Sequence, residues 1–360
     1  MRIYIVLILF IMGCSSYSNN QEKSLKTQII FKENQVQSIN LNSKKIEFEK
    51  IINPEKIALK GSKLFILENI RTNVEAPFIH IIETRNWSYF KSKGKVGFGP
   101  MEISSASFFE PGFSDSTFFT YSSRDKALSE FSLNDTSLLA IRQIKQPDNF
   151  FSVVNLYLLA EDRFIGISVN DENKLIEFNT SGERISGYGN WEPVTGHSEL
   201  SNFNLFELNS GWFKTNDSKD VFVKASIKRD KLEIFNYNDQ SFISVLGPDL
   251  ELPPFQVRGP VGNRSLDVPI SNPYRYRDVA IIDKKIFALY GGISESQYRE
   301  SGELARKIYV FDLQGNPEFI LKLDRSIKGI AIDNIQKKIY GITTDLNPGI
   351  AIFDIPKEVY

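Results

Sequence analysis

The chain has 360 residues, of which 43 are Lys or Arg and 44 are Asp or Glu, giving a formal net charge of −1. This balance excludes the basic surplus of nucleic-acid-binding domains, and we expect no nucleic acid partner. A single cysteine, Cys14, excludes a disulfide framework and a thiolate metal site in the folded part. Hydrophobic residues make up 41% of the chain and include 28 Phe and 14 Tyr, a composition that supports a large core and favours β-sheet.

The first residues are predicted to form a secretory signal. Arg2 precedes a short apolar stretch that ends in the sequence IMGC at positions 11–14. This stretch is too short to span a bilayer as a helix. The sequence IMGC resembles the lipobox of bacterial lipoproteins, which implies that residues 1–13 are a removed signal peptide and that Cys14 carries the lipid. The alternative is an ordinary secretory signal with a chance cysteine.

Lipidation at Cys14 would anchor the protein to a membrane, because each buried CH₂ of a lipid chain contributes about 0.8 kcal/mol. Residues 14–27 are mostly polar and are predicted to form a lipidated flexible tether.

A short pattern then recurs along the chain: an apolar strand with a large apolar residue at a fixed place, usually followed by Asn, Asp or Glu and a turn. A second apolar strand precedes each copy. The large residues that align are Ile82, Phe131, Phe178, Phe235, Phe311 and Phe353. Their spacing suits one four-stranded unit per copy, as in β-propeller blades of about 40–50 residues. Many of these strands are apolar on both faces, which is typical of sheets packed between two others.

The repeat predicts an all-β fold, a single six-bladed β-propeller over residues 28–360. The last copy lacks a terminal outer strand, while strands near residues 28–32 and 45–49 are left over. We therefore expect one of these N-terminal strands to complete the last blade and close the ring. A β-sandwich followed by a second β domain is the alternative, but it does not explain the repeated pattern.

Two stretches interrupt the repeat. Residues 247–274 are rich in Pro and Gly and lengthen the connection between the fourth and fifth blades. Residues 291–306 are polar, lie inside the fifth blade, and include a predicted short helix at 295–303. Long connections within a compact fold are either functional or merely mobile.

The sequence carries no recognisable catalytic motif, so no catalytic residue, metal or cofactor is predicted. The two histidines, His80 and His197, are far apart in sequence. His80 lies in a predicted strand and is expected to be packed, and His197 is expected on an exposed loop. The chain shows no G-x-S-x-G elbow, no phosphate-binding loop and no calcium loop.

Aromatic and Arg side chains concentrate near the predicted blade entries. Trp191, Arg275, Tyr276 and Arg277 are the candidate ligand-binding residues. Arg275 and Arg277 share a face if their segment is extended, and a guanidinium pair suits a carboxylate or a phosphate. The alternative, which we favour, is that both pair with blade carboxylates and hold the ring together.

The sequence GKVGFGPMEI at residues 94–103 resembles a G-x-G-P-x-E-[FI] stretch of the TolB-like six-bladed β-propeller lipoproteins of Bacteroidetes. The segment YRYRD at 274–278, with the strands that follow it, is similar to a late-blade entry of that family. Met101 stands where many relatives have Gly. The resemblance covers most of the chain and implies a propeller fold and an envelope location, but no established biochemical role.

Two hypotheses about function follow. In the first, the chain is a non-enzymatic binding or scaffold module of the cell envelope, with a protein or glycan partner. In the second, it is a propeller-type hydrolase or lactonase with carboxylates or histidines converging on the central channel. Ser15 and Ser16 lack the aspartate associated with inner-membrane retention, and no acidic run follows. We therefore expect an outer-membrane lipoprotein that faces the periplasm.

Overall fold

The computed structural model describes residues 27–69, 76–250, 252–260 and 262–360. The predicted signal peptide, Cys14 and all of the predicted tether except Thr27 lie outside the described residues. No helix among the described residues is long and apolar enough to cross a membrane.

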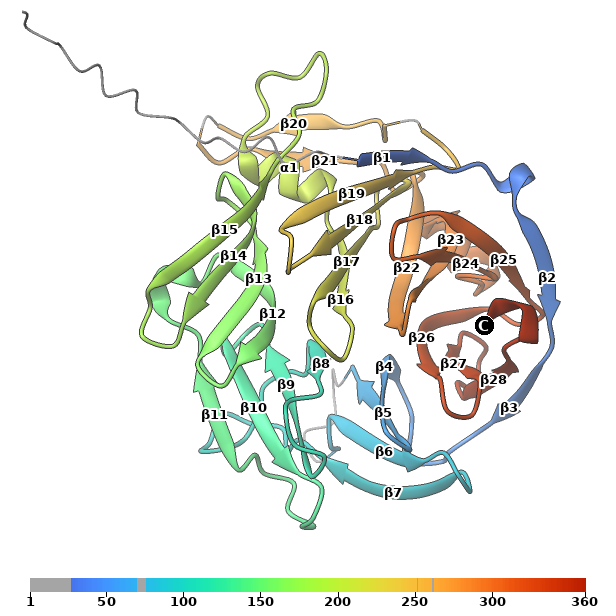
Figure 1. The fold of residues 1–360 in the computed structure, drawn as a ribbon. Coiled ribbons are helices and arrows are strands. Elements are labelled where there is room, and N and C mark those ends of the chain that lie inside the picture. The colour runs from blue at the N-terminus through green and yellow to red at the C-terminus, as the bar shows by residue number, and fades with distance from the viewer. Residues whose placement is uncertain (1–26, 70–75, 251, 261) are drawn as a thin grey trace, which may run out of the picture.

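Six blades of four antiparallel strands each stand around a central axis, two of them extended by a fifth, parallel strand, so the predicted six-bladed β-propeller is confirmed (Figure 1). The first three blades are β4–β7 (Pro54–Lys60, Lys63–Glu68, Ile79–Glu83, Ser88–Lys93), β8–β11 (Phe108–Glu110, Thr117–Ser122, Ala127–Ser132, Arg142–Lys145) and β12–β15 (Val153–Ala160, Arg163–Ser168, Asn173–Asn179, Arg184–Asn190). The last three are β16–β19 (Gly211–Thr215, Val221–Ser226, Lys231–Asn236, Ser241–Leu246), β22–β25 (Pro273–Ile282, Lys285–Ser294, Lys307–Asp312, Pro317–Leu323) and β26–β28 (Ile327–Asp333, Lys338–Thr343, Ile350–Asp354) with β3 (Ser43–Ile46).

The repeated large apolar residue lies on the third strand of every blade. Each copy is at most 2% exposed, so the alignment made from the sequence marks true core positions. The core lies between neighbouring blades, where aromatic rings from two sheets meet. Between the first two blades, for example, the ring centroids of Phe65 and Phe109 are 4.5 Å apart. Burial of such rings on both faces of each sheet explains why the strands are apolar on both sides.

The N-terminal segment closes the ring, as predicted, and it does more than complete one blade. β3 pairs antiparallel with β28 and supplies the missing outer strand of the last blade. Before it, β1 (Thr27–Ile30) pairs in parallel with β19, and β2 (Gln37–Leu41) pairs in parallel with β25. We call β1, β2 and β3 with their connections the belt, residues 27–46. The belt runs along the outer edges of the fourth, fifth and sixth blades (Figure 1).

Most of the belt is exposed, but one of its side chains is deeply buried. Phe31 is 1% exposed, and its ring centroid lies 4.8 Å from that of Tyr309 and 5.5 Å from that of Phe311. The belt thus contributes both backbone hydrogen bonds and a core residue to the fifth blade.

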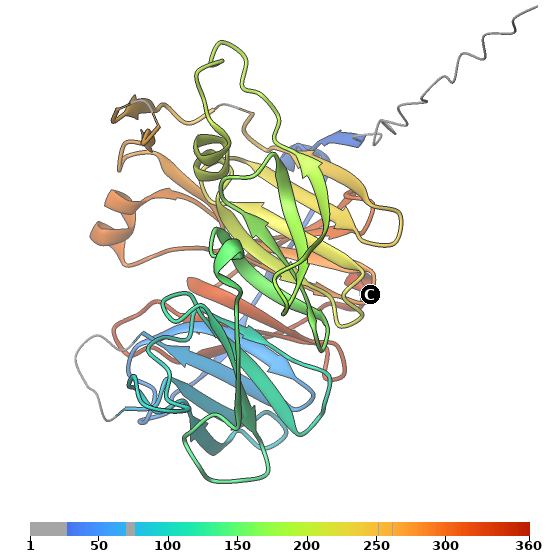
Figure 2. The same cartoon turned by 90° about the vertical axis from the view of Figure 1, so that its left-hand side faces the viewer.

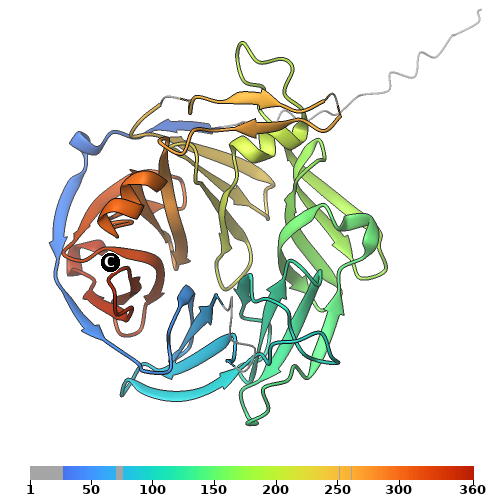
Figure 3. The ribbon, with the colours of Figure 1, turned by 180° about the vertical axis from the view of Figure 1, so that it is seen from behind.

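The irregular connections gather on one side of the ring. They form helix α1 (Asn202–Leu208), the hairpin β20–β21 (Gln256–Arg258, Ser265–Asp267) and helix α2 (Glu295–Ser301). Figure 2 shows all three projecting on the same side, and Figure 3 views the ring from behind Figure 1. The helix predicted at residues 295–303 is confirmed as α2, and the Pro- and Gly-rich stretch contains the hairpin. We call this side the loop face.

Candidate binding site at the channel mouth

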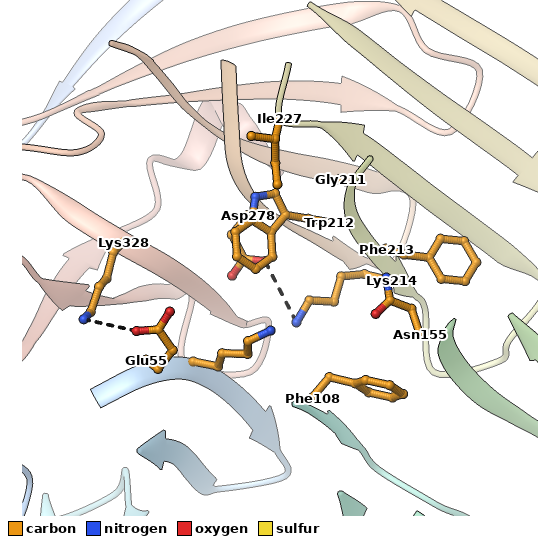
Figure 4. A pocket seen from close by; sticks show the side chains of 11 residues that line it. Glu55, Phe108, Asn155, Gly211, Trp212, Phe213, Lys214, Ile227, Asp278 and Lys328 are labelled. Carbon is orange, nitrogen blue, oxygen red and sulfur yellow. Dashed lines mark ion pairs between the residues drawn. The ribbon is translucent and has the colours of Figure 1, made fainter. Parts of the chain in front are cut away.

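The central channel opens into a cavity of about 110 Å³, to which all six blades contribute (Figure 4). The cavity belongs to the loop face, because Gly211, on its wall, begins β16 three residues after the end of α1. We call it the channel mouth. It is lined by Glu55, Lys56, Phe108, Asn155, Gly211, Trp212, Phe213, Lys214, Ile227, Asp278 and Lys328.

Two backbone features shape the wall of the channel mouth. A Cβ atom on Gly211 would lie 2.1 Å from the carbonyl oxygen of Ala225, so only glycine allows β16 to approach β17 this closely. Asn155 has a φ of 53°, in the left-handed region, at a register shift in β12. Asn is one of the few residues other than glycine that tolerate this conformation. Because of this register shift, Asn155 lines the channel and is not paired with β13.

Lysines dominate the charge of the channel mouth. The Nζ atom of Lys214 is 3.9 Å from Oδ1 of Asp278, and Nζ of Lys328 is 3.7 Å from Oε2 of Glu55 (Figure 4). Both distances are long for ion pairs, since charge-assisted hydrogen bonds are about 2.7–2.9 Å. These two lysines are therefore only weakly neutralised.

Lys56 has no carboxylate within 4 Å among the described residues. Its Nζ lies 5.2 Å from the centroid of the Trp212 ring, a cation–π contact. Burial lowers the pKa of Lys56, and the charge of Lys214 lowers it further against the opposing effects of Asp278 and Glu55. Two ammonium groups thus repel each other at the axis of the ring.

Asp278 is fixed by two adjacent blades. Its Oδ1 accepts a hydrogen bond from the N–H of Val279 at 2.9 Å, and its Oδ2 accepts one from the N–H of Ile330 at 3.0 Å. The side chain is buried, so these bonds hold the carboxylate in one orientation. Trp212 is fixed in a similar way, because its Nε1–H donates to the carbonyl of Tyr276 at 3.1 Å.

Beyond the mouth the channel becomes apolar, with Ile57, Ile281 and Ile330 among its lining residues. At its far end the cations are already engaged. Lys60 donates to three backbone carbonyls, including that of Thr117 at 2.8 Å, and Lys219 lies 2.7 Å from Glu110. The loop face therefore holds the end of the channel where cations lack close partners.

The structure places the predicted candidate residues away from the channel mouth. Arg275 contacts carboxylates, as in the alternative interpretation: its Nη2 is 2.7 Å from Asp249 and its Nη1 is 3.6 Å from Asp230. Tyr276 is fully buried against the ring of Tyr290, with centroids 5.4 Å apart, and no surface of it is left for a ligand.

Arg277 does not share the partners of Arg275. Its guanidinium lies 4.7 Å from the Tyr274 ring centroid and donates to the Ile293 carbonyl at 3.5 Å, with no carboxylate within ion-pair distance among the described residues. Register shifts on either side of Tyr276 break the extended geometry that would have put both guanidinium groups on one face.

Trp191 is buried beside a cluster of charges between the third and fourth blades. Its Nε1–H donates to the Asp171 carbonyl at 3.0 Å, and Nζ of Lys224 lies 4.9 Å from its ring. The charged cluster consists of Lys174, Lys224, Lys231, Glu192 and Glu233.

The charged cluster is centred on the buried carboxylate of Glu233, which contacts all three lysines. Lys224 is 2.6 Å from it and Lys231 is 2.9 Å from it, and Lys174 donates to it as well. Burial opposes ionisation, but the three lysines hold the pKa of Glu233 well below its usual range. Burial lowers the pKa of Lys224 to about 8. The charges of this cluster are engaged in ion pairs with one another, and these pairs join the third and fourth blades.

The histidines lie apart from the channel mouth. His80 is buried in β6, where its Nδ1 is 2.7 Å from the hydroxyl of Tyr89, and burial lowers its pKa to about 4. His197 is partly exposed, 3.1 Å from Glu199. Across the part of the chain that the structure describes, no group of three His, Cys, Asp or Glu side chains could hold a metal ion.

Sequence reasoning missed the lysines and Asn155 of the channel mouth. Lys56, Asn155 and Lys214 come from three blades and have no local motif in common. The only available signal was their place on the first, innermost strand of a blade, where a polar residue faces the axis.

Comparisons with known proteins agree with this architecture. No curated protein matches the chain. A solved protein from Bacteroides fragilis, described as exported, is similar in fold, with a TM-score of 0.53 at 11% identity over 92% of this chain and 100% of its own. A member of the DUF4221 family from Bacteroides vulgatus has a TM-score of 0.55 at 11% identity, over 87% of this chain and 98% of its own.

The family comparison is more direct. The model of the TolB-like 6-blade propeller-like family matches residues 30–335. The match leaves out the first residues of β1 and the last two strands, β27 and β28, and includes every other strand of the ring. With six blades in the structure and this match over most of its length, the chain belongs to the TolB-like six-bladed propeller family.

Proposed function

We propose that the chain is an exported, lipid-anchored protein of the outer membrane that faces the periplasm and binds a protein or glycan partner without catalysis. The export signal and the lipobox-like sequence before Cys14 support the location. A fold similar to that of a Bacteroides fragilis protein described as exported is consistent with it.

The observation that carries the binding role is the convergence of Lys56 and Lys214 on the channel mouth. Cations that lack close carboxylate partners are suited to receive a ligand from outside, because the ligand supplies the missing counter-charge. The helices and the hairpin project from the same side of the ring as the mouth and give a partner further surface to contact (Figure 2).

The alternative of a hydrolase or lactonase calls for carboxylates or histidines that converge on the axis. The charged groups at the channel mouth are three lysines and two carboxylates, of which Glu55 is paired with Lys328 and Asp278 accepts hydrogen bonds from two backbone N–H groups. This arrangement favours binding over hydrolysis.

Native mass spectrometry of the full lipidated chain, extracted from its own envelope in mild detergent, tests the proposal. We expect the wild-type protein to retain a bound species that the double variant Lys56→Met/Lys214→Met lacks. Identical spectra for the two proteins would refute binding at the channel mouth. Turnover of ester or lactone substrates with added divalent metal, abolished by Asp278→Asn, would instead favour the hydrolase.

A further inference from the structure

The channel mouth carries an unbalanced charge. Among the residues that the structure describes, three lysines line it, Lys56, Lys214 and Lys328, and two carboxylates, those of Glu55 and Asp278. Glu55 is paired with Lys328, and the buried Asp278 faces Lys214. Lys56 is the excess cation.

The surroundings of Lys56 do not compensate for this excess. Its cation–π contact with Trp212, at 5.2 Å from the ring centroid, is weaker than a close ion pair. The nearby charge of Lys214 opposes its protonation. An anion placed between the two ammonium groups would replace this repulsion with two attractions.

The size of the excess positive charge indicates which kind of anion would neutralise it. One excess positive charge matches a single negative charge, such as that of a carboxylate at neutral pH. A phosphate group carries a charge between −1.5 and −2 and would give the mouth a net negative charge. The charge at the mouth therefore favours a carboxylate.

The uncharged part of the lining indicates what the carboxylate is attached to. The side-chain amide of Asn155 has no hydrogen bond to any described residue and offers both a donor and an acceptor to a hydroxyl group. Phe108, Trp212 and Ile227 supply apolar surface in the same cavity. A cavity wall with both polar and apolar groups suits a ring that bears hydroxyl groups on an apolar frame.

We propose that the channel mouth binds the carboxylate of a sugar acid, with Lys56 and Lys214 as the partners of the carboxylate and Asn155 as the partner of a ring hydroxyl. The inference rests on the proposed binding function and assigns its ligand to the glycans. A ligand of this class would give Lys56 a close counter-ion.

Isothermal titration calorimetry of the purified full-length protein with four probes tests the inference: D-glucuronate, D-glucose, acetate and inorganic phosphate. We expect D-glucuronate to bind at least tenfold more tightly than each of the other three. Glucose lacks the carboxylate, acetate lacks the ring, and phosphate has the wrong charge.

Four variants connect the binding to the named residues. Lys56→Met and Lys214→Met are each expected to weaken D-glucuronate binding at least tenfold. Asn155→Gly, which suits the left-handed backbone, should weaken glucuronate but leave acetate unchanged. Lys145→Met, on an exposed position of β11, is the matched control and should bind like the wild type. A variant that binds weakly but keeps the melting temperature of the wild type has lost binding and not its fold. If Lys56→Met does not fold, Lys56→Gln is used in its place.

Three results would overturn the inference: tighter binding of phosphate than of glucuronate, equal binding of glucuronate and glucose, or no glucuronate binding at its highest soluble concentration. If any of these occurs while native mass spectrometry still shows a species that depends on Lys56 and Lys214, only the sugar-acid assignment fails. If that species is absent as well, the binding function itself fails.

Discussion

The Nζ atom of Lys307 lies 2.8 Å from Oε1 of Glu33, so an ion pair joins two residues that are 274 positions apart in the chain. The hydroxyl of Tyr309 donates to the same carboxylate oxygen. Burial alone would raise the pKa of Glu33, but these hydrogen bonds and the charge of Lys307 hold it below its usual value. The belt is thus attached to the fifth blade by side chains as well as by the β2–β25 pairing.

Stepwise truncation of the belt should reveal its contribution to stability. Deleting residues 15–24 is expected to leave the melting temperature unchanged, because β1 begins only at Thr27. Deleting residues 15–32 removes β1 and Phe31 and should clearly lower the melting temperature. Deleting 15–50 opens the last blade and should lower it sharply or abolish soluble expression. Thermal denaturation followed by circular dichroism measures the series, and a 15–50 deletion that melts like the full chain would contradict closure by the belt.

A single side chain tests the packing of the belt. Phe31→Ala leaves a cavity between Tyr309 and Phe311 and should reduce the free energy of unfolding by about 3–5 kcal/mol. Phe98→Ala is the control, since Phe98 is 81% exposed and its loss should change the free energy by no more than about 0.5 kcal/mol. Chemical denaturation of both variants supplies the comparison. Similar losses in the two would mean that Phe31 is not a core residue.

The charged cluster between the third and fourth blades should be sensitive to loss of its central carboxylate. Glu233→Gln leaves three buried ammonium groups with Glu192 alone and is expected to destabilise the fold by about 3–5 kcal/mol. Glu303→Gln removes the exposed pair with Arg306 and should cost about 0–1 kcal/mol. Urea titrations of both variants measure the difference, and a mild effect of Glu233→Gln would show that the lysines of the cluster lose their charge readily.

The buried carboxyl group of Asp230 should make the stability of the fold depend on pH in an unusual way. Burial raises its pKa to about 6 from an ordinary value of 3.8, against the opposing effects of Arg275 and the Asp249 N–H. The folded state therefore binds this proton more tightly than the unfolded state does. Protonation of Asp230 therefore stabilises the folded state fully below pH 3.8, and this stabilisation is lost as the pH rises through 6. Relative to the wild type, Asp230→Asn should gain melting temperature between pH 4 and pH 7. A difference that stays constant over this range would contradict the raised pKa.

The proposed anchor predicts a change in cell fractionation. Cys14→Ala should move the protein from the membrane fraction to the soluble fraction, because the thiol is the site of lipid attachment in a lipobox. Protease added to intact cells should spare the wild-type protein if it faces the periplasm. A Cys14→Ala protein that stays with the membrane would refute the lipobox interpretation, and digestion in intact cells would indicate surface exposure.

The sequence predicted the ring well, because each blade repeats the same local requirement. A large residue such as Phe178 or Phe353 must fill the space between two sheets, so apolar residues recur at the same place in every unit. The parallel pairing of β1 and β2 could not be predicted in this way. These strands are mostly exposed, and their sequence alone does not distinguish an outer partner of a blade from a free strand.

The channel mouth could not be predicted for a related reason. Lys56 and Lys214 resemble ordinary solvated lysines on short strands, and only closure of the ring brings them to one axis. The Arg275 and Arg277 pattern was conspicuous because both residues stand close together in the sequence. Proximity in the chain indicated a shared site there, yet bulges in β22 separate their contacts.

The belt also fixes the order in which the molecule can be completed. Its strands are synthesised, and on the proposed route exported, before any blade, whereas their partners β19, β25 and β28 all lie in the last third of the chain. Each belt strand therefore waits unpaired until its own partner has followed, β1 for the fourth blade, β2 for the fifth and β3 for the last, and contacts between such distant segments form slowly. During that interval their unpaired edges are open to pairing with other chains. A nascent chain that stalls before β28 would leave an open ring, ready for proteolysis.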